Sequence, residues 1–290
     1  MWNENGECSG GDFLQLGYNT NGFAHHRLED VFDILASIGY HAIAVTLEHD
    51  LLDSFDRTGV SSAISQLRKL GDRFGLVMTL ETGARFLLDP RRKHQPTLMS
   101  EGASDRKRRR EFLFAAIDIA QGVNATCVSL WSGRADKNTR AEVLRNRLEK
   151  ELRILLEYAQ MRDVRLAFEP EPGMFVETMA QFARLERALD HPLFGLTLDV
   201  GHIHCLGDGE AESHIARWHE KLFNVHIEDM NQGVHEHRMF GEGSVSFEPV
   251  FDALRACSYA GPVNVELSRH SHDAVVAAKR SLEFLRSYVA

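Results

Sequence analysis

The stretch Leu196-Thr197-Leu198-Asp199-Val200-Gly201-His202 decides how the whole chain is interpreted. Its β-prone apolar residues run into an acid, a glycine and a histidine, which is the pattern of a buried strand that presents Asp199 and His202 at its C-terminal end. The same pattern recurs at three other apolar runs, residues 166–168, 223–225 and 263–265, which lead into Glu169, His226 and Glu266. Four successive strands are therefore each expected to end in a potential metal ligand.

Strand and helix signals alternate along the rest of the chain. Strands are predicted over residues 13–18, 41–47, 76–80, 126–131, 164–168, 194–198, 222–227 and 263–267. Apolar residues at helical spacing predict helices over 28–38, 60–74, 105–121, 139–162, 178–189, 210–219, 247–256 and 273–288. Eight strand–helix pairs favour an α/β fold with one (β/α)8 TIM barrel. A doubly wound open sheet is the alternative, but no GxGxxG turn follows the first strand.

The domain prediction is an N-terminal extension over residues 1–12 and one barrel domain over residues 13–290. With 33 basic and 42 acidic residues, the net charge is -9, which argues against a nucleic-acid partner. No apolar run reaches the roughly 18 residues of a membrane span, and the polar N-terminus has no signal-peptide pattern, so we expect a cytoplasmic protein without a membrane partner. The four cysteines are too scattered for a thiolate metal site. The sequence leaves a homo-oligomer open.

In a barrel, the C-terminal ends of all strands lie on one face, which is where active sites are found. Glu169, Asp199, His226 and Glu266 would therefore meet at one mouth despite their separation along the chain. Three carboxylates and one imidazole suit a divalent metal such as Mn²⁺, Mg²⁺, Co²⁺ or Zn²⁺. For any single acid, an alternative is that it caps the helix that follows its strand. Four such ends in succession favour a metal site.

Several motifs resemble those of the xylose isomerase-like TIM-barrel superfamily, also called the sugar phosphate isomerase/epimerase family. They are Phe168-Glu169, Leu198-Asp199-Val200-Gly201-His202, Val225-His226-Ile227-Glu228-Asp229, Phe240-Gly241-Glu242-Gly243 and Val265-Glu266-Leu267. The resemblance implies that Glu169, Asp199, His226 and Glu266 hold one divalent metal. It also implies that the two glutamates are the catalytic acid and base, and that His202 and Arg238 contact substrate oxygens.

Other residues are candidates for substrate contacts at the same mouth. Glu171 competes with Glu169 as a ligand, but Glu169 directly follows its strand, so we expect Glu171 to contact substrate or to support the ligands. Glu81 and Trp131 stand at the ends of earlier strands, where they could supply hydrogen bonds and an apolar wall to a substrate, or serve only in capping and packing. In the loop 82–104, the run Arg91-Arg92-Lys93 could meet a substrate phosphate or be a solvated surface.

The loop over residues 229–246 contains His235 and His237, which could bind a second metal, contact substrate or line a lid. In apurinic-site endonucleases of the superfamily, an Asp-x-His at this position completes a three-zinc site. Those enzymes also use histidines on earlier strands, where this chain has Glu81 and Trp131. Together with the negative net charge, this difference argues against DNA repair.

The resulting prediction is a metal-dependent isomerase or epimerase that acts on a small sugar, keto-sugar or cyclitol. A metal polarises a carbonyl and its neighbouring hydroxyl, so that a glutamate can remove the adjacent C–H proton. Two alternatives stay open: a dehydratase of the same superfamily, and a barrel that binds a metal and ligand without turnover.

Overall fold

The computed structural model describes residues 14–52 and 55–289, and in it eight parallel strands close into a barrel in the order β1-β10-β7-β6-β5-β4-β3-β2. The strands are β1 (Gln15–Asn19), β2 (Ala42–Thr46), β3 (Val77–Glu81), β4 (Val128–Trp131), β5 (Leu166–Glu169), β6 (Phe194–Asp199), β7 (Leu222–Ile227) and β10 (Pro262–Val265). The predicted single (β/α)8 barrel is confirmed. The predicted extension, residues 1–12, and Phe13 lie outside the described residues.

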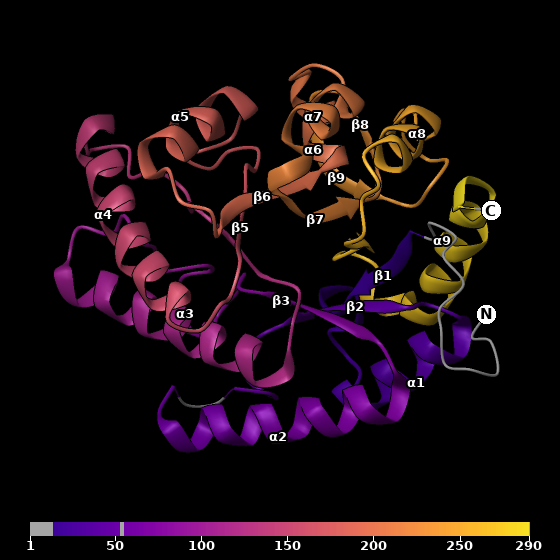
Figure 1. Ribbon diagram of the computed structural model, residues 1–290, viewed down its shortest axis with the longest axis horizontal. Coiled ribbons are helices and arrows are strands. Elements are labelled where there is room, and N and C mark those ends of the chain that lie inside the picture. Colours follow the sequence, from indigo (N-terminus) through magenta and orange to yellow (C-terminus); the bar gives the residue numbers. More distant parts are fainter. Residues whose placement is uncertain (1–13, 53–54, 290) are drawn as a thin grey trace.

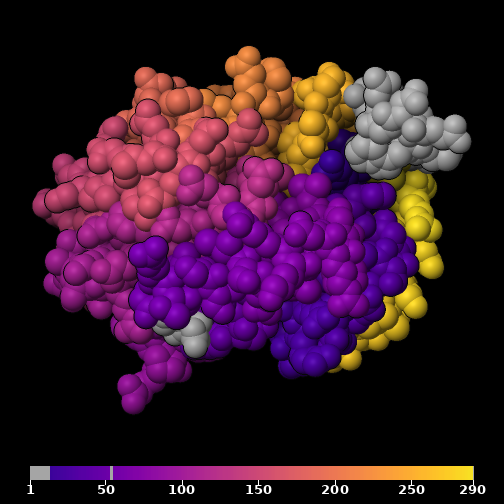
Figure 2. Space-filling model, turned by 60° about the horizontal axis from the view of Figure 1, so that its bottom comes forward, coloured from indigo at the N-terminus to yellow at the C-terminus, as the bar shows by residue number. Residues whose placement is uncertain are grey.

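Helices surround the barrel as an outer ring (Figure 1). They are α1 (Leu28–Ile38), α2 (Arg57–Phe74), α3 (Ala103–Val123), α4 (Ala141–Gln160), α5 (Met179–Leu189), α6 (Val200–Leu206), α7 (Ala211–Trp218), α8 (Glu248–Ala256) and α9 (Ala274–Val289). In Figure 2, the earlier part of the chain, coloured indigo to magenta, covers most of the visible face. No helix of the described residues is both long and apolar enough to cross a membrane.

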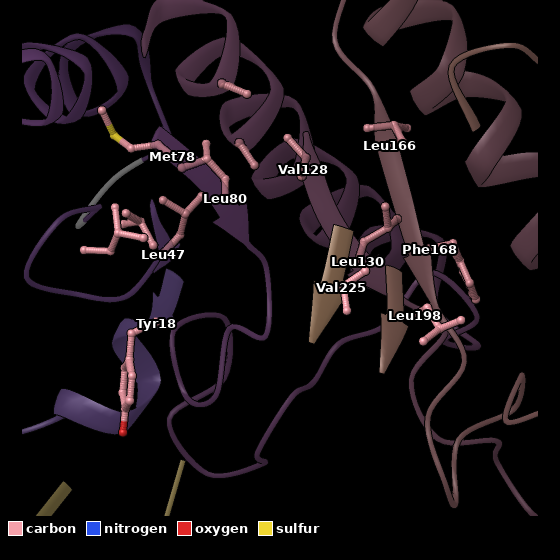
Figure 3. Packing of buried hydrophobic residues seen from close by; sticks show 14 of the residues in the cluster. Tyr18, Leu47, Met78, Leu80, Val128, Leu130, Leu166, Phe168, Leu198 and Val225 are labelled. Carbon is pink, nitrogen blue, oxygen red and sulfur yellow. The ribbon is translucent and has the colours of Figure 1, made fainter. Parts of the chain in front are cut away.

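The apolar core lies between the strands and the ring of helices (Figure 3). Alternate residues of a strand point to opposite faces, and the outward residues of these strands are apolar. Phe168 of β5, for example, packs against Phe194 of β6 and Phe182 of α5, with ring centroids 5.7 and 6.4 Å apart. Burial of each such side chain stabilises the folded state by roughly 1.5–3 kcal/mol relative to leaving it exposed. This packing fixes which residues of each strand must face inward.

The inward residues of the later strands are polar and hydrogen-bonded to one another across the barrel. Ser129 Oγ lies 3.0 Å from Thr197 Oγ1, and Asn264 Nδ2 donates to Asn224 Oδ1 at 3.0 Å. Asn224 Nδ2 in turn donates to Glu81 Oε1 at 3.2 Å. These residues are buried, and apart from Asn264 Oδ1, which has no partner among the described residues, their bonds satisfy polar groups that would otherwise be costly to bury. The layer forms a floor, and the next inward residue along each strand stands above it at the C-terminal mouth.

The local structure at this mouth differs from the prediction in one segment and adds a helix in another. The segment 229–246 is not a plain loop, because β8 (Asp229–Asn231) and β9 (Val234–Arg238) form an antiparallel hairpin. Its two-residue turn has Gly233 at φ +75°, a conformation that suits glycine. Residues 200–206, for which no element was predicted, form α6, because the Asp199 carboxylate caps that helix by accepting from His202 N at 2.7 Å.

Candidate active site

The four predicted metal ligands come together at the mouth. Glu169, Asp199, His226 and Glu266 stand at or just after the ends of β5, β6, β7 and β10, and one ligand atom of each lies within 4.8 Å of the others. Asp199, His226 and Glu266 each follow a residue of the polar floor by two positions, and Glu169 follows the inward-facing Ala167 in the same way, so the period of two aims all four inward. All but Asp199, which lies deeper, line a cavity of about 510 Å³. The barrel register therefore produces the arrangement that the repeated strand endings predicted.

His226 is the centre of this arrangement. Its Nδ1 lies 2.9 Å from Glu266 Oε2 and 3.2 Å from Glu169 Oε1, while its Nε2 lies 2.9 Å from Glu81 Oε1. Burial alone would lower the pKa of His226, but the neighbouring carboxylates Glu81, Glu266 and Glu169 together raise it well above its usual value. One ring nitrogen of His226 thus faces the two glutamates, and the other faces Glu81.

The two glutamates differ in their electrostatic surroundings. Burial raises the pKa of Glu169 well above its usual value. Burial would also raise the pKa of Glu266, but the charge and hydrogen bond of His226 hold it well below its usual value. Asn21, in the short 3-10 helix Thr20–Phe23 after β1, donates to Glu266 Oε1 at 2.7 Å, while His226 approaches the other oxygen of that carboxylate. Asn21 was missed from the sequence, where nothing distinguished it from its polar neighbours.

This donor set fits a divalent cation on the chemistry of its atoms. Asp199 uses Oδ1 to cap α6, whereas its buried Oδ2 has no hydrogen-bond partner in the described chain. A buried carboxylate oxygen without a partner is costly unless a cation or proton joins it. Asp199 therefore combines the two roles that the sequence presented as alternatives, helix cap and candidate ligand.

Three histidines form a second cluster in the same cavity. His202 Nε2 lies 3.0 Å from His235 Nε2, and each of His202, His235 and His237 offers a nitrogen within 4.8 Å of the others. Burial lowers the pKa of His202 to about 4 and also lowers that of His235. His237 Nδ1 donates to the backbone oxygen of Glu266 at 3.0 Å, which leaves its Nε2 free as an acceptor or ligand.

Of the remaining predicted substrate contacts, some line the cavity and one does not. Glu81, Trp131 and Glu171 line the cavity, and burial raises the pKa of Glu171 to about 8. Arg238 does not line it, because its Nη2 turns to Glu236 Oε2 at 2.8 Å. Arg269 binds the other oxygen of Glu236 at 2.6 Å and does line the cavity.

Glu228 is a buried acid to which the sequence assigned no role. Both of its carboxylate oxygens lack hydrogen-bond partners among the described residues, and burial raises its pKa well above the usual value. Together with Asp199 and His237 it forms a further group of potential ligand atoms within 4.8 Å. The signal was available, since period two puts Glu228 on the same side of its strand as His226. Gly201 makes room for it, because a Cβ at residue 201 would lie 2.0 Å from Glu228 Oε1.

The sequence profile of the family described as "Xylose isomerase-like TIM barrel" matches residues 32–288. The chain belongs to this family. The predicted resemblance is thereby confirmed, and the match covers the strand ends that carry Glu169, Asp199, His226 and Glu266.

Among curated relatives, L-ribulose-5-phosphate 3-epimerase UlaE of Escherichia coli strain K12 is 26% identical over 255 residues, which are 86% of this chain and 88% of the relative. The solved structure of the E. coli 3-keto-D-glucoside 4-epimerase YcjR superposes with a TM-score of 0.76 at 17% identity, covering 94% of this chain and 99% of the other. The IOLI protein, described with a bound zinc atom, superposes with a TM-score of 0.75 at 15% identity, covering 95% and 98%. The prediction of a sugar isomerase or epimerase agrees with these relatives.

Proposed function

We propose that this protein is a divalent-metal-dependent epimerase of keto-sugars. One observation carries the proposal: Glu169 and Glu266, from different strands of the barrel, approach the same nitrogen of His226 at 3.2 and 2.9 Å inside one cavity. The curated relatives support the reaction type, because they are named 3-epimerases. An epimerase of this kind needs two proton-transfer groups beside one reactive carbon, and the pair of glutamates supplies them.

Glu169, Asp199, His226 and Glu266 would hold the metal. A bound divalent ion supplies a Lewis acid that polarises the substrate carbonyl and acidifies the neighbouring C–H bond. For inversion, one glutamate removes the proton from that carbon and the other returns a proton to the opposite face. Asn21 orients Glu266 through its 2.7 Å hydrogen bond, and Glu81 orients His226 through its 2.9 Å contact.

The cluster of His202, His235 and His237 is the candidate for a second metal site or for contacts with substrate hydroxyls. Three imidazoles that open onto a cavity leave a ligand position for water or substrate, as in catalytic zinc sites. We therefore expect elemental analysis to find between one and two equivalents of metal. Loss of only the second equivalent in His235→Ala would assign it to this cluster, whereas unchanged metal content would leave the histidines to the substrate.

A panel of free and phosphorylated ketoses tests the reaction class. The protein, loaded with Mn²⁺, Co²⁺, Mg²⁺ or Zn²⁺, should produce an epimer that NMR identifies, and a chelator should abolish the reaction. A dehydrated product would replace the proposal with the dehydratase alternative. Tight binding of a ketose without any product would favour the barrel that binds without turnover.

A further inference from the structure

Basic side chains gather on the cavity wall formed by the loop between β3 and α3. Arg85, Lys93 and His94 line the cavity there. Arg92 is neutralised, because Asp89 accepts from its Nε at 2.7 Å, and the same carboxylate binds the backbone nitrogens of Arg91 and Arg92. Of the three basic residues in the run at 91–93, only Lys93 therefore reaches the cavity.

Lys93 has no ion-pair partner in the part of the chain that the structure describes. Arg85 is held in place, because its Nη2 donates to Asn21 O at 3.0 Å and its Nε lies 3.5 Å from Glu48 Oε1. Glu48 does not line this cavity, whereas Arg85 does. The wall thus offers one ammonium group without an ion pair among the described residues, although its charge acts on Glu171 in the same cavity, beside a positioned guanidinium group.

Arg109 of α3 adds a buried positive charge directly behind this wall. Its side chain is 3% exposed and lies over the ring of Trp131, with its carbon Cζ 5.4 Å from the ring centroid. Its Nη2 donates to Thr82 O, whereas Nη1 is buried and has no partner among the described residues. No carboxylate within the described chain pairs with it, and a buried charge without a counter-ion is costly.

The positive charges of Lys93, Arg109 and Arg85 all act on His94. The His94 ring meets Trp131 edge-on, with centroids 5.3 Å apart, so it lies on the same wall. Burial, and then the charges of Lys93, Arg109 and Arg85, lower the pKa of His94 to about 4. The metal-binding carboxylates would repel an anion, so a negatively charged end of the substrate is more stable against this wall.

We propose that this wall binds the phosphate group of a phosphorylated keto-sugar, with Lys93 as the main contact and Arg85 beside it. The inference rests on the proposed function for the identity of the rest of the substrate. The opposite end of the sugar then reaches the strand-end carboxylates, and the cavity of about 510 Å³ lies within the usual range for small-ligand pockets. A phosphate monoester carries about 1.5–2 negative charges at pH 7, and Lys93 supplies an opposite charge beside the guanidinium of Arg85, which is also paired with Glu48.

Binding of inorganic phosphate tests the site without any catalysis. Titration calorimetry on the full chain, with a chelator present, should detect phosphate binding that Lys93→Gln weakens roughly tenfold, as for loss of one charge-assisted contact. Arg91→Gln is the matched control, because it removes the same charge from the same loop at a side chain outside the cavity. Equal weakening by both variants, or no phosphate binding by the unchanged protein, would overturn the inference.

Kinetics with the metal-loaded protein separate this inference from the proposed function. We expect kcat/KM for a ketopentose 5-phosphate to exceed that for the free ketopentose. Lys93→Gln should raise KM for the phosphorylated sugar roughly tenfold and so reduce this difference. Equal or greater kcat/KM for the free sugar would refute the phosphate site and leave the epimerase standing. Phosphate binding that needs Lys93, without turnover of any ketose, would support the site and refute the epimerase.

Discussion

The two walls of the cavity are built in different ways. On one wall, Glu169 and His226 belong to strands whose register the whole barrel fixes, and they are almost completely buried. On the other, Lys93 and His94 belong to the segment between β3 and α3, where they are exposed or half-buried. Rigid strands suit groups that must keep fixed distances for chemistry, while loops can change the substrate without disturbing the barrel. Substitutions on the strand wall should therefore change kcat and metal content, whereas substitutions on the loop wall should change KM.

Glu266→Gln should cause the largest loss on the strand wall. Glutamine retains an oxygen but cannot accept the proton, so we expect kcat to fall roughly 10²–10⁴-fold with KM little changed. Steady-state kinetics at saturating metal measure this effect. Glu242→Gln is the matched control, since that acid is half-exposed and outside the cavity. Full activity in Glu266→Gln would remove Glu266 from the chemistry.

Asp199→Asn and Asp199→Ala separate the two roles of this residue. Loss of a residue that only hydrogen-bonds to a metal ligand typically weakens metal binding roughly 10–100-fold. Asp199 is proposed as a direct ligand, so both variants should weaken metal binding by at least that factor. Only alanine also removes the cap of α6, which should lower the free energy of unfolding by about a further 1 kcal/mol. Metal titration and chemical denaturation give the two values. Unchanged metal affinity in both variants would exclude Asp199 from the centre.

Glu81→Gln should have a smaller effect, because Glu81 acts through His226. Removing the charge beside Nε2 leaves the imidazole less well oriented and less basic, so we expect a roughly tenfold loss of metal affinity. Metal affinity, determined by competition with a chelator, is the measurement. An effect on KM for the sugar at saturating metal, with no change in metal affinity, would instead make Glu81 a direct substrate contact.

His94→Gln should have the smallest effect, and it appears only in acid. The pKa of folded His94 is about 4, below the usual value of about 6.5. Between these values the unfolded chain binds a proton that the folded chain does not, so stability falls as the pH drops. Between pH 7 and 4.5, the free energy of unfolding should fall by about 1 kcal/mol less in the variant than in the unchanged protein. This figure is reduced to allow for the partial exposure of the ring. Identical pH dependence in urea denaturation would contradict this.

The sequence predicted the parts of the molecule that periodicity controls. Strand endings such as Asp199 could be found because apolar runs of known length must end at one face of a barrel. Glu228 was missed although its spacing from His226 contained the signal. Arg109, Asn21 and Arg269 could not be found in this way, because their places depend on helix packing and loop conformation, which no local pattern encodes. The loop 229–246 was misjudged because the Gln232-Gly233 turn makes it a hairpin.

The central claim is that the metal and the two glutamates exchange the proton on one carbon of a ketose. Its most direct test is NMR of metal-loaded protein with a ketopentose 5-phosphate and the free ketopentose in D₂O. We predict deuterium at the carbon next to the carbonyl together with formation of the epimer, and neither in the presence of a chelator. Epimer formed without deuterium incorporation, or exchange that persists after the metal is removed, would contradict the account.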